Sequence, residues 1–275
     1  MKPITVTAAA LIAVSAVGIL NQGSLKDKTG RFSIQNFTSG SIRRNKQDKS
    51  QSFRVKGNPV IITTKPSGPA SVSMIVAKAP EAAGTAVDSG NGLELQQATL
   101  SGGMTIEATQ PQGKSTISGQ QGDFKQLAEK AVITVTPKCT AVVTRPQTTL
   151  NVAGAKSVFT LMGKLAQAEK NRDYTLDVDG PCSMDYHQAG ATSKGVPTKT
   201  NVHATGDHLS ATPRQIKLDG HVHLTGNDPT LFGESTFDSV VIDLDEAGEI
   251  LEINYYGNPG TAIIAPAPGG GGRKR

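Results

Sequence analysis

Polar and apolar residues alternate along residues 201–253, and this is the clearest pattern in the chain. The even-numbered positions from 216 to 224 hold apolar or small residues, namely Ile216, Leu218, Gly220, Val222 and Leu224. The odd-numbered positions from 215 to 225 hold polar residues, namely Gln215, Lys217, Asp219, His221, His223 and Thr225. Side chains of a strand alternate between its two faces, so the pattern predicts strands with one apolar and one solvated face. Turn residues near 206, 212, 226–229 and 247 divide the stretch into several strands.

A glycine followed by an alternating strand recurs upstream of this stretch. The unit begins at Gly57, Gly103, Gly180 and Gly220, with steps of 46, 77 and 40 residues between these glycines. The middle step is close to twice the others. The spacing therefore predicts a supersecondary unit of about 40 residues that stacks on its neighbours.

The rest of the chain also favours strands and turns. Residues 81–92 are a small-residue stretch, expected as a connection and as a possible boundary between two halves. Residues 188–200 are expected to form an exposed loop. Residues 123–131 are the one segment after the N-terminus that could form a short helix, because Phe124 and Leu127 have helical spacing.

The N-terminal segment contains no charge from residue 4 to residue 20. Its length and the preceding lysine predict a signal peptide or a single-pass membrane anchor over residues 1–24, with a buried core segment as the alternative. We expect a folded β region over residues 25–258 outside the cytoplasm. Residues 259–275 are rich in Gly and Pro and basic at the end, which predicts a flexible tail.

Composition adds few constraints. The chain has no Trp, 4% aromatic residues and a net charge of +5. Its cations cluster at residues 43–46 and 273–275, which favours solvated turns over a nucleic-acid-binding surface. Cys139 and Cys182 leave a disulfide and two free thiols equally open. The absence of a CxxC motif argues against a redox motif or a zinc knuckle.

Histidine clustering is the one feature that suggests an enzyme. His203, His208, His221 and His223 lie within 21 residues, and an H-x-H pair on a strand can bind zinc or copper if a third ligand is supplied. A cupin-like metal enzyme is therefore an alternative. The pair lies on the polar face, however, and no carboxylate or cysteine has ligand spacing. We find no nucleophile elbow or phosphate loop either, so we expect no catalysis and no cofactor.

The unit around residues 206–224 resembles a known family. It reads Gly206-Asp207-His208-Leu209, then Leu218-Asp219-Gly220-His221-Val222-His223-Leu224, followed by Leu231-Phe232-Gly233-Glu234, with a fainter copy from Gly154 to Cys182. This pattern is similar to the OstA-like periplasmic β-jellyroll proteins of the lipopolysaccharide-transport (Lpt) system. The likeness is good over residues 201–253 and thin elsewhere.

The resemblance implies a mainly β fold, namely a folded-over antiparallel β-jellyroll built from repeated strand units, with an N-terminal apolar helix. It further implies a non-catalytic periplasmic protein that carries lipopolysaccharide-type lipid and serves outer-membrane biogenesis. Such a protein would pair edge to edge with other jellyrolls, and residues 4–20 would anchor it in the inner membrane. The alternative is a structural β-repeat protein of the cell envelope without lipid cargo.

A lipid carrier needs an apolar lining. Exposing an acyl chain to water costs about 0.8 kcal/mol per methylene, so a twelve-carbon chain needs roughly 10 kcal/mol of shelter. The candidate lining residues are Leu93, Leu95, Met104, Ile106, Leu176, Val178, Ile216, Leu218, Val222, Leu224, Val240, Ile242 and Leu244. A dry core made of the same residues is the competing interpretation.

Overall fold

The computed structural model describes residues 23–65, 74–110, 113–163, 173–191, 197–228, 231–257 and 261–262. Within these ranges no helix is long and apolar enough to cross a bilayer. The predicted N-terminal apolar helix lies outside the described residues, and so does nearly all of the predicted tail. The strands are β1 (Gly23–Lys26), β2 (Phe32–Arg44), β3 (Ser50–Thr64), β4 (Met74–Asp88), β5 (Leu93–Gln110), β6 (Gly113–Gln126), β7 (Lys130–Thr136), β8 (Cys139–Thr144), β9 (Thr148–Gly154), β10 (Lys156–Met162), β11 (Tyr174–Ala191), β12 (Pro197–Ala211), β13 (Gln215–Asp228), β14 (Leu231–Leu244), β15 (Ile250–Tyr256) and β16 (Thr261–Ala262).

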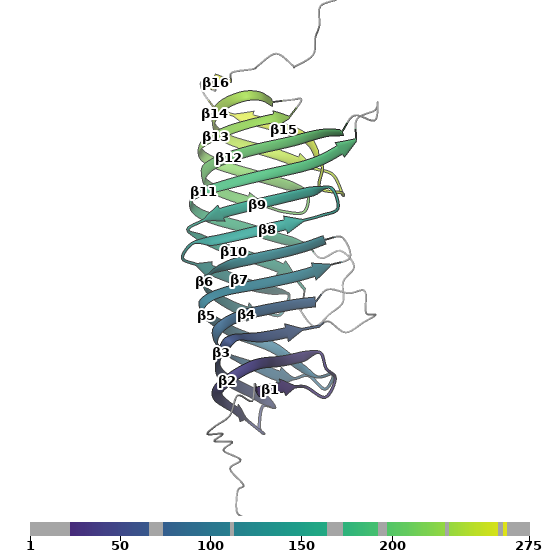
Figure 1. Ribbon diagram of the computed structural model, residues 1–275, viewed down its shortest axis with the longest axis vertical. Helices are drawn as coiled ribbons and strands as arrows, with labels where there is room; N and C mark the ends of the chain where they lie inside the picture. The colour runs from purple at the N-terminus through teal and green to yellow at the C-terminus, as the bar shows by residue number, and fades with distance from the viewer. Residues whose placement is uncertain are drawn as a thin grey trace, which may run out of the picture.

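All sixteen strands belong to one antiparallel sheet. The chain winds back and forth, so that each long strand pairs with the one before it and the one after it. Figure 1 shows the strands stacked along the long axis of the molecule, with β1 at one end and β14 to β16 at the other. The prediction of a mainly antiparallel β protein is confirmed.

Most long strands change direction near their middle, at a bulge. Register shifts fall at Lys56/Val60, Ser101/Met104, Asp179/Cys182 and Asp219/Val222, which are the four places where the repeated glycine unit begins. Bulges bend a strand, and Gly180 and Gly220 have positive φ angles of 84° and 74° there. The repeat of about 40 residues is therefore two successive strands, each with a bend. We call the line of bends the crease.

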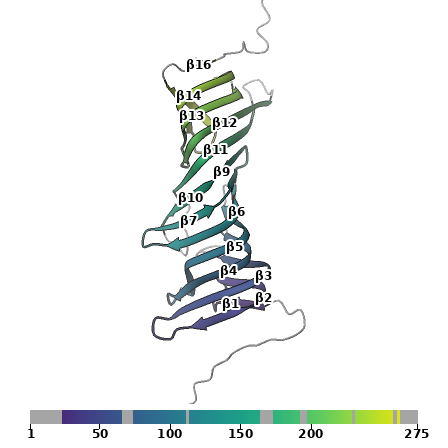
Figure 2. The ribbon, with the colours of Figure 1, turned by 90° about the vertical axis from the view of Figure 1, so that its left-hand side faces the viewer.

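The crease divides the sheet into two wings. The first wing contains residues 37–44, 50–57, 81–88, 93–101, 121–126, 130–136, 156–162, 174–179, 208–211, 215–219, 239–244 and 250–256. The second wing contains residues 23–26, 32–36, 60–64, 74–79, 104–110, 113–119, 139–144, 148–154, 182–191, 197–206, 222–228, 231–237 and 261–262. Figures 1 and 2 show the two wings as layers that run the length of the molecule.

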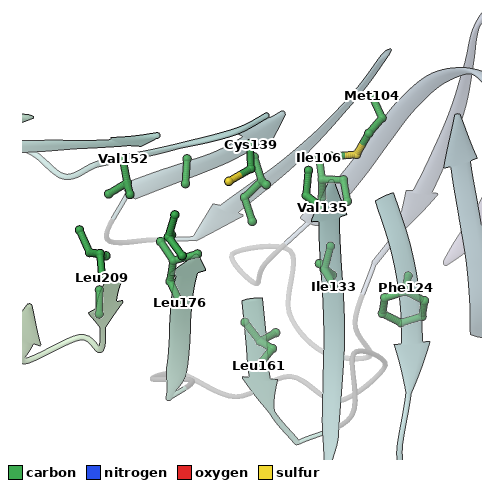
Figure 3. Close-up of a cluster of buried hydrophobic side chains, with 14 of the residues drawn as sticks. Met104, Ile106, Phe124, Ile133, Val135, Cys139, Val152, Leu161, Leu176 and Leu209 are labelled. Atoms are coloured by element: carbon green, nitrogen blue, oxygen red, sulfur yellow. The ribbon is translucent and has the colours of Figure 1, made fainter. Parts of the chain in front are cut away.

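The inner faces of the two wings form one hydrophobic core. Figure 3 shows Met104, Cys139 and Val152 reaching from one layer toward Leu161, Leu176 and Leu209 from the other. Period-two alternation produces this arrangement, because every second residue of each half-strand points inward.

Three local expectations are wrong. Residues 123–131 form no helix, because Phe124 points inward as part of β6 while Asp123 and Lys125 face outward, and β6 pairs with β5 and β7. Residues 81–88 are not a connection but the second half of β4, paired with β3 and β5. Strands β11 and β12 extend into most of the loop expected over residues 188–200. In each case pairing with neighbouring strands overrides weak local propensity.

Candidate functional site

The interior between the wings contains all of the residues that the sequence placed on the apolar face. Twelve of the thirteen are buried members of the single core cluster, and Leu95 packs against that cluster. They come from β5, β11, β13 and β14, and both wings contribute, as with Leu218 from the first and Leu224 from the second. The structure therefore brings these side chains together in one interior. Their contact with lipid stays a prediction.

Several side chains in the C-terminal half of the interior are fully buried. Leu218, Val222, Leu224, Val240 and Ile242 have no exposed surface, as expected of a filled core. In the middle of the molecule, Leu161 and Ile133 keep 7% of their surface exposed, and Phe124 and Ile106 keep 6%. Core residues near the two ends, namely Leu93, Leu244 and Ile253, keep 8% exposed, so each part of the interior comes close to solvent at a few positions.

Two groups of polar contacts join the wings on the open side, which is the side opposite the crease. The first latch lies near the N-terminal end and consists of Asp27, Arg31, Asn91 and Leu93. The Asp27 carboxylate accepts hydrogen bonds from the backbone N–H of Phe32 at 3.1 Å and of Leu93 at 3.2 Å. Arg31 Nη1 donates to the carbonyl oxygen of Asn91 at 3.2 Å. The turn before β2 is thereby attached to the start of β5.

The environment of Asp27 favours its ionised form. Partial burial raises the pKa of this carboxyl, but hydrogen bonds from the Thr29 side chain and from the backbone of Phe32 and Leu93 outweigh burial, so the pKa is lowered. The first latch therefore depends on a carboxylate that is charged at neutral pH.

The second latch lies near the C-terminal end and consists of Arg145, Tyr174, Tyr186, Gln188 and Gly248. The Tyr186 hydroxyl donates to the carbonyl oxygen of Gly248 at 2.8 Å and lies 2.9 Å from Gln188 Oε1. Gln188 Oε1 also accepts from the backbone N–H of Ile250 at 3.3 Å. These contacts connect β11 in the second wing with the turn between β14 and β15 in the first.

Arg145 adds a second connection in this latch. It lies in the turn between β8 and β9 and hydrogen bonds to Tyr174 at the start of β11. Gly248 has a φ of 84°, a conformation that favours glycine, and a Cβ atom there would displace the Arg145 guanidinium. Burial raises the pKa of both Tyr174 and Tyr186, so both phenols remain protonated at neutral pH.

Exposed apolar side chains lie at strand ends between the two latches. Met74 begins β4 and is 36% exposed, while Leu127 follows β6 and Met162 ends β10, each 45% exposed. We call these three residues the rim. A hydrocarbon that entered the middle of the interior from the open side would pass beside them.

The two cysteines are free and buried. Cys139 is in β8 and Cys182 is in β11, and β9 lies between these strands. Two inter-strand spacings place their Cα atoms about 10 Å apart, beyond the roughly 7 Å that a disulfide can span. The thiols instead donate to backbone oxygens, Cys139 to Gly154 at 3.5 Å and Cys182 to Gly206 at 3.2 Å. The structure thus answers the question that the sequence left open.

All five histidines lie on the outer faces of β11, β12 and β13. His203 Nδ1 is 2.6 Å from Asp185, His208 Nδ1 is 3.2 Å from Asp179 and His221 Nδ1 is 2.7 Å from Asp207. The hydrogen bond and the charge of Asp207 raise the pKa of His221. Within the described ranges, no group of three or more His, Cys, Asp or Glu side chains is placed to hold a metal ion.

The sequence did not point to the latch residues. Asp27, Arg145, Tyr186 and Gly248 belong to turns and strands that are far apart in the chain, and no local motif relates them. Comparison with known proteins adds no further guide, since no protein-family model, no curated protein and no solved structure matches this chain.

Proposed function

We propose that this protein is a non-catalytic lipid carrier of the cell envelope, exported to the periplasm and engaged in lipopolysaccharide transport or outer-membrane assembly. Acyl chains would occupy the interior of a folded-over β-jellyroll, and the lipid head group would stay in water. The observation that carries the proposal is the interior itself, in which two apolar wings meet along a crease and are joined on the open side by two separate latches.

The middle of the molecule is the favoured site of cargo binding. The apolar rim of Met74, Leu127 and Met162 lies beside it, and these three side chains are 36–45% exposed. The crease supports a change in the angle between the wings, because bulges interrupt the hydrogen-bond ladder there. A small opening about the crease would admit an acyl chain without unfolding either wing.

Partner proteins would add strands at the ends of the sheet. In the part of the chain that is described, β1 and β15 each pair with one neighbour only. A free strand edge is a template for pairing with another β protein. On β15, Leu251 is 68% exposed and Tyr256 is 56% exposed, so this edge offers apolar contacts as well as backbone groups. We propose that other jellyrolls of the envelope dock at these edges and that the N-terminal segment attaches the protein to the inner membrane.

The decisive experiment is photo-crosslinking to lipopolysaccharide from two adjacent positions of β5. A small diazirine amino acid at Ile106 would face the interior, and the same amino acid at Thr105 would face outward. We expect a lipid adduct from position 106 and little from position 105. Equal labelling from both positions, or none from position 106 in a folded protein, would rule out the carrier function.

The fully buried side chains in the C-terminal half of the interior favour a second function, namely a structural envelope protein without cargo. Five of its predicted lining residues have no exposed surface, which is what a permanently filled core requires. This function predicts that the protein purified from its host carries no extractable lipid and that position 106 gives no adduct.

A further inference from the structure

A broad hollow lies on the outer face of the first wing, on the side of the sheet that faces away from the interior. Its volume is about 1000 Å³, and it extends across β2 to β7. Its residues lie in cross-strand rows, one of which pairs Ser41 with Arg54, Arg54 with Ala83, Ala83 with Thr99 and Thr99 with Asp123. Residues that pair directly across strands project to the same side of a sheet, so the whole row faces solvent.

Long side chains stand at the two ends of the hollow and short ones lie between them. Arg43 on β2 and Arg54 on β3 are diagonal neighbours at one end, within reach of the same ligand group. Lys125 on β6 stands near the other end, three inter-strand spacings across and two residues along from Arg54, or roughly 16 Å. The floor between them is formed by Ala83, Thr85 and Thr99.

The charges of the hollow are available to a ligand. Within the described part of the chain, none of Arg43, Arg54 and Lys125 forms an ion pair with a carboxylate. The one carboxylate of the hollow, Asp123, accepts hydrogen bonds from Thr99 Oγ1 at 2.7 Å and Gln121 Nε2 at 3.0 Å. The hollow thus combines free cations, hydroxyl groups and a carboxylate held in a fixed position.

We propose that this hollow binds an acidic saccharide chain. The forked guanidinium groups of Arg43 and Arg54 are suited to a carboxylate or phosphate group of the sugar. The ring hydroxyls would donate to Asp123 and exchange hydrogen bonds with Thr85 and Gln97. A nucleic acid fits less well, because the two aromatic residues at the hollow, Phe53 and Phe124, point into the interior and offer no stacking surface.

The saccharide site is independent of the lipid interior. The hollow and the interior lie on opposite faces of the same wing, so a saccharide without acyl chains would bind even if the interior carries no cargo. A saccharide displayed on a lipid would present the same chemistry. A free saccharide would bind without a membrane, whereas a lipid-borne saccharide would bind only at a membrane surface.

The test is a titration of the full-length protein with an oligogalacturonate by isothermal calorimetry, with a neutral malto-oligosaccharide as the comparison. We expect saturable binding of the acidic chain alone, and an approximately tenfold loss of affinity in Arg54→Gln, since a charge-assisted hydrogen bond contributes roughly that factor. Arg44→Gln is the matched control. It removes the same charge at the residue next to Arg43 on β2, but its side chain faces the other side of the sheet, so affinity should be unchanged.

A second variant tests whether the saccharide binds in the hollow by filling the hollow with a larger side chain, without changing any charge. Thr85→Tyr fills the floor of the hollow with a residue that strands accept well, so binding should be lost while folding is retained. Binding seen only when the acidic saccharide is displayed as a glycolipid on phosphatidylcholine vesicles, and still lost in Arg54→Gln, would assign the source to a lipid-borne saccharide. The proposal is overturned if the acidic chain binds no better than the neutral one, or if Arg44→Gln weakens binding as much as Arg54→Gln.

Discussion

The hydroxyl of Tyr186 and the carbonyl oxygen of Gly248 are 62 positions apart in the chain and 2.8 Å apart in space. Their hydrogen bond connects the two wings at the second latch. Tyr186 is 2% exposed, so removal of its hydroxyl leaves a buried carbonyl oxygen without its donor.

Tyr186→Phe should therefore lower the free energy of unfolding by about 1–3 kcal/mol. It should also increase amide hydrogen exchange in the turn between β14 and β15. Urea denaturation and hydrogen-exchange mass spectrometry measure the two effects. The control is Tyr256→Phe on the edge strand, where the ring is 56% exposed and little change is expected. Equal effects of the two substitutions would contradict a specific role for the second latch.

The first latch should weaken in acid. Because the pKa of Asp27 in the folded protein is lowered from its ordinary value of 3.8, the carboxylate contributes stability that is fully present above about pH 4. That contribution is lost as the pH falls through the folded-state pKa. Asp27→Asn should lower the melting temperature at pH 7 through a loss of at most about 1 kcal/mol, and the difference from the native protein should shrink below pH 4.

Melting curves of the native protein and of Asp27→Asn between pH 7 and pH 3 provide this measurement. The control is Asp177→Asn on the outer face of β11, which takes no part in the first latch. A difference between native protein and Asp27→Asn that stays constant down to pH 3 would show that the charge of Asp27 is not what holds the first latch.

Gly220 should tolerate no side chain. Its φ of 74° lies in the left-handed region, and a Cβ atom there would collide with the side chain of Asp207. Gly220→Ala should cost about 1–2 kcal/mol for the backbone alone and more for the displacement of Asp207. Gly30→Ala separates the two costs, because Gly30 has a φ of 68° and open space around it. Chemical denaturation should show the larger loss in Gly220→Ala, and the reverse order would refute the bend geometry.

The two regions of apolar residues should respond differently to truncation. Leu218 is completely buried in the C-terminal half of the interior, so Leu218→Ala should lower the free energy of unfolding by about 2–5 kcal/mol. Leu127 is 45% exposed at the rim, so Leu127→Ala should change stability by no more than about 0.5 kcal/mol. Thermal and urea denaturation of both variants test this contrast. A small loss in Leu218→Ala would indicate a cavity already present in that half.

Local periodicity was sufficient to assign the faces of individual strands. The assignment of Leu218, Val222 and Leu224 to the interior and of His221 and His223 to the outer face follows from alternation alone, because consecutive side chains of any strand point to opposite sides. The recurring glycines were also readable in advance. A positive φ favours glycine, as at Gly103, Gly180 and Gly220, so most of these bends leave a periodic signal in the chain.

Other features depend on which strands become neighbours, and that is decided by contacts across the whole sheet. Residues 123–126 form a strand because β5 and β7 supply hydrogen-bond partners that the local sequence does not reveal. Cys139 and Cys182 stay apart because β9 is inserted between them.

The hollow beside Arg54 exists because six successive strands, β2 to β7, align their short side chains in rows. The sequence by itself therefore determined the secondary structure class and the inward and outward faces, since both arise from interactions within a few residues. Only the tertiary structure decided the crease, the latches and the outer hollow, since each requires atoms from strands that are distant in the chain.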